Sequence, residues 1–525
     1  MPTTARPVTL SRPVRYHEDA SSLFAHLGAA DATDSVLFES ADITTKSGLN
    51  SVAVLESSLR LTCDGDTVTA EPLSPSGDYF AERLASQLAE FHEGSGRFTF
   101  PPSDAADERA RLSAVSSVEV LRALTTGAEY AGEANVLPML AGGFAFDYLA
   151  TFEELPAVGE SINTYPDFQF VLAEVVLTIN HQERTAKLHG VAAGNGVDTL
   201  SSRLDTLVDA IAAAEPGAEH AYEPTPTESS TLTVEVDITD DKFRSQVEDL
   251  KHHIRNGDVY QVVPARTFTA PCPDAFAAYR QLRETNPSPY MFYARGLDRD
   301  GEGYELFGAS PESNLKFDPR DREIQLYPIA GTRPRGLRPD GSVDDELDIR
   351  MELAMRTDAK EIAEHTMLVD LARNDLARVA VPGTRKVADL LQVDRYSRVM
   401  HLVSRVTATL AEDLDALDAY RACMNMGTLT GAPKLKAVEL LRGVEMTRRG
   451  SYGGAVGYLR GDGLMDNCIV IRSAYVSRGV AAVQAGAGVV RDSSPQAEAD
   501  ETLHKAYAVL HAIALAAGAD LEVVR

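Results

Sequence analysis

Apolar positions divide the chain into two parts, which a polar stretch separates. In the first part, residues 51–63 (SVAVLESSLRLTC) and 168–180 (FQFVLAEVVLTIN) have apolar patterns of β-strands, and residues 80–93 and 200–213 have helical spacing. Residues 214–230 (AEPGAEHAYEPTPTESS) are rich in Pro, Glu, Thr and Ser, which is typical of a linker. We therefore predict an N-terminal lobe, residues 1–225, and a C-terminal lobe, residues 226–525.

The second part interleaves helical and strand-like patterns. Helical spacing occupies residues 240–255, 358–373, 416–424 and 495–516. Strand-like runs occupy residues 260–270, 288–297, 304–317, 453–460, 467–476 and 481–490. No repeat of fixed period is present. This order favours a mixed α+β fold over a regular βαβ repeat.

Composition and charge narrow the class of protein. With 525 residues, 44% of them hydrophobic, the chain can bury a large core. A net charge of −28 argues against nucleic acid and anionic membranes as partners. No signal peptide and no run of about 18 apolar residues is found, which favours the cytoplasm. The four cysteines, Cys63, Cys272, Cys423 and Cys468, stand singly, as reduced thiols do.

Two acidic pairs are candidates for a metal site. Glu361 and Glu364 are three apart in a helical pattern and so project from one face, and Glu498 and Glu501 lie off the apolar stripe of another helix. Carboxylate oxygens are the ligands that magnesium prefers, and magnesium also accepts oxygens from an anionic substrate. In so acidic a chain, each pair taken alone is more often a solvated helix face.

Two polar residues interrupt apolar runs. Arg472 lies within residues 467–476, where a buried arginine needs either an internal carboxylate or a bound anion as its partner. A planar guanidinium suits a substrate carboxylate. His401 lies among aliphatic residues, where it is either a hydrogen-bonded core residue or a group for proton transfer.

Glycine-rich segments accompany these residues, namely YPIAGTRPRG, TLTGAPK, GSYGGAVGY and QAGAGVV. Glycines beside a strand allow sharp bends or close approach to a ligand, although ordinary turns have the same composition. None of the segments matches a phosphate loop or a dinucleotide fingerprint. Four such segments in one half of the chain favour a shared site.

These segments, together with LVDLARND and EADETLHKA, resemble the chorismate-utilising enzymes, and most closely the large component of anthranilate synthases. The resemblance extends from LFESADI near the start through GGFAFDYL to the C-terminal helix. It implies a two-lobed α+β fold with a large, sandwich-like antiparallel sheet core flanked by helices. It also implies a cytoplasmic, magnesium-dependent lyase of tryptophan biosynthesis.

Two positions separate the members of this family. Aminodeoxychorismate synthases typically carry a lysine, able to attack the substrate, where this chain has Ala330. Isochorismate and salicylate synthases carry a lysine that is thought to activate water where this chain has Gln261. Both positions favour ammonia as the nucleophile and anthranilate as the product.

The resemblance implies a role for each matching residue. Glu364 and Glu501 would bind magnesium directly, with Glu361 and Glu498 as further or water-mediated ligands. Tyr452 and Arg472 would hold the enolpyruvyl carboxylate of chorismate. The rest of the implied site consists of Gly331, Thr332, Gly486, Ala487 and Gly488 around the substrate, His401 and Thr428 beside the reacting ring, and Glu312 as general acid.

The same resemblance implies a partner and an inhibitor. None of the cysteines has the setting of a glutamine amidotransferase nucleophile, so a separate amidotransferase subunit would supply ammonia, in a complex with two copies of each chain. Five residues match the site at which tryptophan inhibits these enzymes: Glu39, Ser40, Pro289, Tyr290 and Met291. Phe38 departs from the family's LLES pattern, which leaves the shape of that pocket open.

Two rival functions remain at this point. Aminodeoxychorismate synthase is the nearer rival, and Ala330 argues against it. The other is a catalytically silent protein that keeps the fold and senses tryptophan. The glutamates, Tyr452 and Arg472 argue against the second rival, because a silent protein has no need of them.

Overall fold

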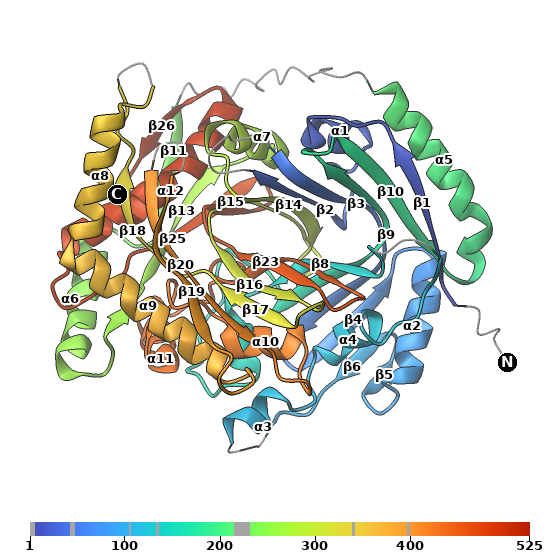
Figure 1. Ribbon diagram of the computed structural model, residues 1–525, viewed down its shortest axis with the longest axis horizontal. Helices are drawn as coiled ribbons and strands as arrows, with labels where there is room; N and C mark the ends of the chain where they lie inside the picture. The colour runs from blue at the N-terminus through green and yellow to red at the C-terminus, as the bar shows by residue number, and fades with distance from the viewer. Residues whose placement is uncertain are drawn as a thin grey trace.

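Antiparallel strands form the centre of the molecule, and helices cover its outer faces (Figure 1). The computed structural model describes residues 6–41, 48–103, 105, 107–132, 136–214, 231–338, 342–395 and 399–525. The first described strand, β1, and the C-terminus lie on opposite sides of the view in Figure 1. The α+β class and the large helix-flanked sheet that the sequence predicted are confirmed.

The helices begin and end at residues that satisfy their terminal hydrogen bonds. Asp415 makes a capping box before one of them, and Gly257 and Gly518 end two others in the left-handed conformation. The helices are α1 (Ala20–His26), α2 (Pro75–Gln87), α3 (Glu108–Leu112), α4 (Glu119–Leu124), α5 (Val197–Ala213), α6 (Asp240–Asn256), α7 (Ala275–Thr285), α8 (Asp345–Thr357), α9 (Ala359–Ala377), α10 (Ala416–Cys423), α11 (Lys434–Glu445) and α12 (Pro495–Ala517), with short 3-10 turns η1 (Phe146–Thr151) and η2 (Gly194–Gly196).

The strands come from both halves of the chain. Before residue 215 they are β1 (Val8–Val14), β2 (Ser35–Ala41), β3 (Gly48–Asp64), β4 (Thr67–Pro72), β5 (His92–Gly94), β6 (Arg97–Thr99), β7 (Ala131–Gly132), β8 (Met139–Phe144), β9 (Phe168–Asn180) and β10 (Thr185–Ala192). After residue 230 they are β11 (Thr231–Val236), β12 (Gln261–Val262), β13 (Ala265–Pro271), β14 (Tyr290–Leu297), β15 (Gly303–Ser310), β16 (Ser313–Asp318), β17 (Glu323–Leu326), β18 (Ile329–Pro334), β19 (Lys386–Arg395), β20 (Val399–Thr409), β21 (Gly431–Ala432), β22 (Ala455–Arg460), β23 (Met465–Ile469), β24 (Ser473–Ser477), β25 (Val480–Gly486) and β26 (Asp520–Val523).

Strand pairing joins the two halves of the chain. β2 pairs with β14, where Glu39 lies opposite Met291, and β8 pairs with β22, where Phe144 lies opposite Ala455. The hydrophobic core also contains side chains from both halves of the chain. Phe144 of β8 stacks on Tyr420 of α10, with ring centroids 4.3 Å apart. Strands from both halves therefore share one sheet. The division at residue 225 stays a prediction, because residues 215–230 lie outside the described residues.

Helices cover different parts of this sheet. α5 packs on β1 and β10, at the right of Figure 1, whereas α12 packs on β25 and against α6 and α7, towards the left. α9 packs on β18 and β20, on the same side of the view as α12. None of the helices within the described ranges is long and apolar enough to cross a membrane.

Most elements that the sequence predicted are present. The strands at 51–63 and 168–180 are confirmed, as are the helices at 200–213, 240–255, 358–373, 416–424 and 495–516. The helix predicted at 80–93 is wrong at its end: it stops at Gln87, and His92–Gly94 form strand β5 instead, which a turn with positive φ angles at Gly94, Ser95 and Gly96 joins to β6. Six helices of the described chain were not predicted, namely the short helices α1, α3 and α4 and the longer helices α7, α8 and α11.

Four predicted strands are interrupted. The runs at 260–270, 304–317 and 467–476 each divide into two strands, and the run at 481–490 ends as a strand at Gly486. Pro264 and Pro311 stand at two of the breaks, where the missing N–H ends the ladder, and Arg472 stands at another with a φ of 50°. All four breaks border one cavity.

Candidate functional site

A cavity of about 590 Å³ opens where the interrupted strands meet α9 and α12. Its walls contain every residue of the sequence-predicted substrate, metal and catalytic sets except Ala487, whose side chain is fully buried. The predicted residues that line it are Glu312, Gly331, Thr332, Glu361, Glu364, His401, Thr428, Tyr452, Arg472, Gly486, Gly488, Glu498 and Glu501. Glu312 and Glu501 are 189 positions apart in the chain and thus line the same cavity.

The acidic pairs lie on two helices that border the cavity. Two of the four carboxylates contact basic side chains of the protein. Glu361 of α9 accepts a hydrogen bond from the Arg333 guanidinium at 2.6 Å. Glu501 of α12 lies 2.6 Å from the Lys505 ammonium, which also donates to the Gly486 carbonyl at 2.9 Å. Sequence reasoning missed Arg333 and Lys505. The four-residue spacing of Glu501 and Lys505 on one helix is the signal that could have found the second.

The four glutamates make an oxygen-only donor set. Among the residues that the structure describes, no three acidic, histidine or cysteine side chains are grouped closely enough to hold a metal ion by themselves. An incomplete protein shell agrees with the chemistry of magnesium, which keeps several waters and takes oxygens from an anionic substrate. The donor set therefore fits magnesium, and it does not fit the closed nitrogen and sulfur sites of zinc.

Arg472 supplies positive charge to the same cavity, where the effect of burial on its pKa is partly offset by the negative charges of Glu501 and Glu312. Its backbone leaves the strand conformation between β23 and β24, and burial lowers the pKa of its guanidinium, which nonetheless stays charged. Within the described residues, no carboxylate forms an ion pair with Arg472. The internal salt bridge that the sequence left open is therefore not found in the described part of the chain, and Arg472 is available to an anion.

Tyr452 and two glycines shape the space beside Arg472. Tyr452 is 5% exposed, and burial raises the pKa of its phenol to about 12, so it remains a hydrogen-bond donor at neutral pH. A Cβ at Gly486 would lie 3.2 Å from the Tyr452 hydroxyl and 3.0 Å from the Pro264 carbonyl. Gly331 has a φ of 90°, and its Cβ would lie 3.3 Å from a Glu361 oxygen. Side chains at these glycines would therefore disturb both Tyr452 and Glu361.

Glu312 is a buried carboxyl on the cavity wall. It follows Pro311 at the break between β15 and β16 and is 4% exposed. Burial raises its pKa to about 8, although the Thr428 hydroxyl donates a hydrogen bond to it at 3.1 Å, which favours the ionised form. A carboxyl that keeps its proton at neutral pH can act as a general acid.

His401 has the opposite character. Burial, and then the positive charge of Arg472, lower the pKa of its imidazole to about 4. Its Nδ1 lies 2.9 Å from the Thr332 hydroxyl, so the ring is fixed against the strand that carries Gly331 and Thr332. A neutral imidazole at working pH can accept or donate a hydrogen bond but brings no charge to the cavity.

A second histidine, which follows the Glu361 and Glu364 pair and to which the sequence analysis assigned no role, ties α9 to this strand. His365 of α9 is fully buried and donates from Nδ1 to the Ala330 carbonyl at 3.0 Å. Its Nε2 lies 2.7 Å from the Ser404 hydroxyl, which in turn accepts the Leu391 amide at 3.0 Å. This chain of bonds fixes α9 relative to β18, β19 and β20.

A separate cavity of about 630 Å³ contains the five residues that match the tryptophan site. Glu39, Ser40, Pro289, Tyr290 and Met291 line it together with residues of β3, β9, β10, β22 and β23. The Glu39 carboxylate accepts the Tyr279 hydroxyl at 2.5 Å, and Arg283 lies 3.1 Å from it. The Tyr290 hydroxyl donates to Asp466 at 3.1 Å. Residues of α7 thus hold the Glu39 carboxylate in place, and a residue of β14 holds that of Asp466.

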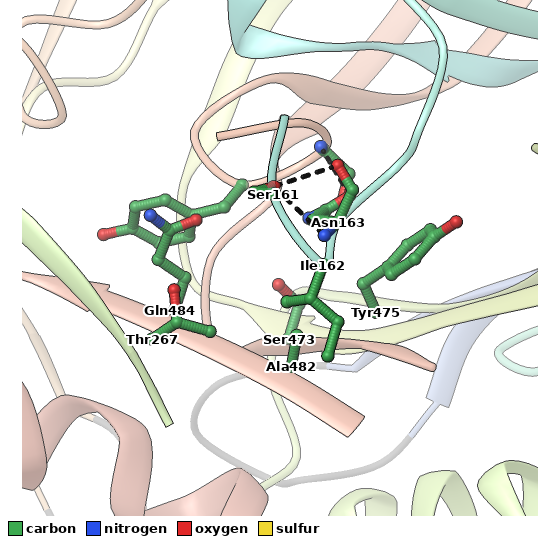
Figure 2. Close-up of a pocket in the computed structure, with 10 residues that line it drawn as sticks. Ser161, Ile162, Asn163, Thr267, Ser473, Tyr475, Ala482 and Gln484 are labelled. Atoms are coloured by element: carbon green, nitrogen blue, oxygen red, sulfur yellow. Dashed lines mark hydrogen bonds between the residues drawn. The ribbon is translucent and has the colours of Figure 1, made fainter. Parts of the chain in front are cut away.

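Figure 2 shows a much smaller polar pocket next to the large cavity. Its volume is about 10 Å³, which is room for one water molecule. Ser161 and Asn163, joined by hydrogen bonds, lie on one side of it, with Thr267, Ser473 and Gln484 on other sides. Tyr452 lines both this pocket and the large cavity, so its ring forms part of the wall between them.

The sequence matches the family described as chorismate binding enzyme over residues 86–511. It is 49% identical to anthranilate synthase component 1 of Vibrio cholerae, over 97% of each chain. It is 48% identical to anthranilate synthase component 1 of Escherichia coli, over 95% of this chain and 96% of the relative.

Solved structures are similar along nearly the whole chain. Anthranilate synthase component I from Streptococcus pneumoniae superposes with a TM-score of 0.66 at 27% identity, covering 88% of this chain and 92% of the other. The menaquinone-specific isochorismate synthase of Escherichia coli superposes with a TM-score of 0.64 at 18% identity, covering 97% and 96%. The second likeness concerns the fold alone.

Proposed function

The chain belongs to the family of chorismate binding enzymes, and on that premise we propose that it acts as the magnesium-dependent component 1 of an anthranilate synthase. It converts chorismate to anthranilate, the first step from chorismate to tryptophan. The observation that supports the finer proposal is the large cavity, whose lining contains four glutamates of α9 and α12 together with Arg472, which forms no ion pair with a carboxylate among the described residues.

Chorismate is a dianion with one carboxylate on its ring and one on its enolpyruvyl group. The Arg472 guanidinium and the Tyr452 hydroxyl can both donate hydrogen bonds to an anion, and both line the cavity close to each other. They bind the enolpyruvyl carboxylate. The ring carboxylate then faces the helices α9 and α12, where acidic side chains alone would repel it.

A magnesium ion held by these glutamates would offset that repulsion. Glu364 and Glu501 would hold the ion, with Glu361 and Glu498 close by, and bound magnesium supplies a positive charge that draws electron density through the ring carboxylate. Arg333 and Lys505 partly neutralise Glu361 and Glu501, so they limit the negative charge of the site.

Proton transfer falls to the buried groups. Glu312 keeps its proton up to a pH of about 8, and it donates that proton to the departing 4-hydroxyl, which leaves as water. The Thr428 hydroxyl then stabilises the carboxylate that remains on Glu312. Ammonia adds to ring carbon 2, and loss of the proton from that carbon together with departure of the enolpyruvyl group as pyruvate makes the ring aromatic.

The nucleophile comes from outside the chain. Ala330 and Gln261 line the cavity at the positions where relatives with other products carry a lysine, so neither position supplies an amine or a base for water. All four cysteines are buried, and burial raises the pKa of each thiol, so none of them has the setting of an amidotransferase nucleophile. A glutamine amidotransferase partner therefore supplies ammonia, in a complex of two copies of each chain in the cytoplasm.

Tryptophan acts as feedback inhibitor in the second cavity. Pro289, Tyr290 and Met291 line that cavity, whereas Asn286 and Ser288 of the same segment line the catalytic cavity. A ligand that fixes this segment in one arrangement thus favours or disfavours chorismate through the chain itself.

The test is the fluorescence of anthranilate formed by the purified chain from chorismate, magnesium and an ammonium salt at mildly alkaline pH. We expect anthranilate and pyruvate in equal amounts, with turnover abolished by EDTA and in Glu364→Ala. Asp370→Ala on the same helix, whose side chain is 74% exposed, is the matched control and should retain activity. Aminodeoxychorismate as product would replace the proposal with the nearer rival, and no turnover would favour a silent protein.

A further inference from the structure

Arg449 is a buried cation behind the wall of the catalytic cavity. It lies in the segment between α11 and β22 that also carries Tyr452, and its side chain is 2% exposed. It does not itself line the cavity, and the mechanism proposed for this cavity gives it no role. Burying a charge is costly unless an ion pair and hydrogen bonds compensate for it, so the contacts of its guanidinium indicate what the charge is used for.

The Arg449 guanidinium contacts three residues that line the catalytic cavity. It donates to the Val263 carbonyl and to the Leu429 carbonyl, each at 2.8 Å. Leu429 directly follows Thr428, so the second of these bonds fixes the backbone beside the Thr428 hydroxyl. The guanidinium carbon also lies over the Tyr452 ring, 5.6 Å from its centre. One buried cation therefore joins three separate pieces of the cavity wall.

Both halves of the chain fix the position of Arg449. Glu445, at the end of α11, accepts the Arg449 Nε–H at 2.8 Å and the Ala265 amide at 2.9 Å. From the N-terminal half, the centre of the Phe146 ring lies 4.4 Å from the guanidinium carbon, and the Asp147 carboxylate accepts the Arg449 backbone N–H at 3.0 Å. Phe146 and Asp147 belong to the segment GGFAFDYL, for which the mechanism of the cavity has no other use.

Arg421 of α10 is a useful comparison, because it is buried in the same way. Its side chain is also 2% exposed, its guanidinium donates to the Leu112 carbonyl at 2.6 Å, and the centre of the Phe152 ring lies 4.6 Å from the guanidinium carbon. Neither Leu112 nor Phe152 lines the catalytic cavity. The two arginines thus share burial, a carbonyl acceptor and an aromatic ring, but of the two Arg449 alone contacts the cavity wall.

We propose that Arg449 is a positioning residue, both for the binding of chorismate and for proton donation by Glu312. This inference rests on the proposed function, in which Tyr452 binds the enolpyruvyl carboxylate. The cation against the Tyr452 ring fixes that ring, and with it the place of the hydroxyl. The bond to the Leu429 carbonyl fixes the backbone beside Thr428, whose hydroxyl donates to Glu312 at 3.1 Å.

The first measurement is the Kd of chorismate, by calorimetric titration of the full chain with magnesium and without ammonia. Arg449→Lys keeps the charge, but an ammonium has all its donors on one atom and cannot bond both carbonyls and Glu445 as the planar guanidinium does. We expect the Kd to rise at least about tenfold. Arg421→Lys is the matched control and should bind chorismate as the wild type does. An unchanged Kd in Arg449→Lys, or a similar rise in both variants, would overturn the proposal.

The second measurement is the pH dependence of kcat/KM, which a merely structural role would leave unchanged. With the Leu429 carbonyl released, the hydrogen bond from Thr428 to Glu312 weakens, so the alkaline fall of kcat/KM should move to higher pH. Adding Arg449→Lys to Thr428→Val should cause no further shift, because that hydrogen bond is already absent. A shift of the same size in the Thr428→Val background would overturn the link to Glu312.

Phe146→Leu keeps the proposal testable if Arg449→Lys does not fold. It removes the ring beside the guanidinium but retains the buried charge, and it should raise the Kd of chorismate about threefold or more. An unchanged Kd in this variant would count against the positioning role. A wild type that binds chorismate but forms no anthranilate would refute the proposed function alone, because the calorimetric comparison does not depend on the product.

Discussion

The two large cavities have nearly the same volume, about 590 and 630 Å³, but they are built differently. The catalytic cavity is bordered by strand ends and by α9 and α12, and it contains Arg472 without a carboxylate partner among the described residues. The second cavity is bordered mainly by continuous strands, and its acidic residues Glu39 and Asp466 each accept a tyrosine hydroxyl. This difference supports our proposal that the first cavity takes a charged ligand with a metal ion and the second a ligand without net charge.

The cavities nevertheless share two segments of chain. Residues 286–291 border the catalytic cavity at Asn286 and Ser288 and the second cavity at Pro289, Tyr290 and Met291. Residues 466–472 do the same, with Asp466 and Cys468 at the second cavity and Ile471 and Arg472 at the first. Charge therefore distinguishes the two sites, while backbone continuity couples them.

Removing the acidic proton of Glu312 should have the largest effect on the rate of anthranilate formation. Glu312→Gln should lower kcat by roughly 10²- to 10⁴-fold, because general acid catalysis contributes about that much. In the wild type, kcat/KM should fall as pH rises through the Glu312 pKa of about 8, since only the protonated form donates. Initial rates of anthranilate formation between pH 6 and 10 measure both effects.

The Thr428 hydroxyl allows a sharper form of that test. Its hydrogen bond favours the ionised carboxylate, so Thr428→Val should move the alkaline fall of kcat/KM to higher pH. An alkaline limb that stays unchanged in Glu312→Gln would assign it to another group and remove Glu312 as the acid.

Removing the charge of Arg472 should have the next largest effect. Arg472→Leu should cost about 2 to 5 kcal/mol of chorismate binding in the transition state, a fall of roughly 30-fold or more in kcat/KM. Arg478→Leu is the matched control: it follows the other end of β24, is 73% exposed, and should change kcat/KM little. Similar losses in both variants would indicate that the strand, rather than the charge, is responsible.

Filling the second cavity should have a smaller and selective effect. Ser40→Phe places a ring beside Pro289 and Tyr290 and should raise the tryptophan concentration for half inhibition at least about tenfold, which corresponds to about 1.4 kcal/mol. The KM for chorismate should change little. The chain contains no tryptophan, so the fluorescence of added tryptophan reports binding directly. Unchanged inhibition would move the inhibitor to another site.

Sequence patterns alone predicted a mixed fold, several helices and two of the long strands, because apolar periodicity is a local property. They could not predict where strands end at the cavity. Arg472 lies in a run that looks like one buried strand, and its positive φ arises from the way β23 and β24 meet different neighbours. Tertiary pairing, rather than local propensity, decides such breaks.

The candidate residues came largely from the family resemblance, and most of them meet in one cavity. The resemblance did not supply the partners of those residues. Arg333 beside Glu361, Lys505 beside Glu501, and His365 between α9 and β18 are contacts across elements, and no spacing in the sequence predicts the first or the third. The charge around the predicted metal ligands therefore had to be learned from the structure.

His365 offers the mildest test, because it touches neither ligand and acts by position. His365→Leu leaves the Ala330 carbonyl and the Ser404 hydroxyl without this buried partner, at a cost of about 1 to 3 kcal/mol in the free energy of unfolding. Burial lowers the pKa of His365 below its usual 6.5, so the unfolded chain takes up a proton that the folded chain does not. The wild type should therefore lose stability as pH falls below about 6.5, and the variant should lose less over that range. Denaturant unfolding at pH 5.5 and 7.5 measures this difference. If His365 positions α9, the His365→Leu variant should also need a few-fold higher magnesium concentration than the wild type for half-maximal activity, since α9 carries Glu361 and Glu364. Lower stability with unchanged magnesium dependence would make His365 a core residue only.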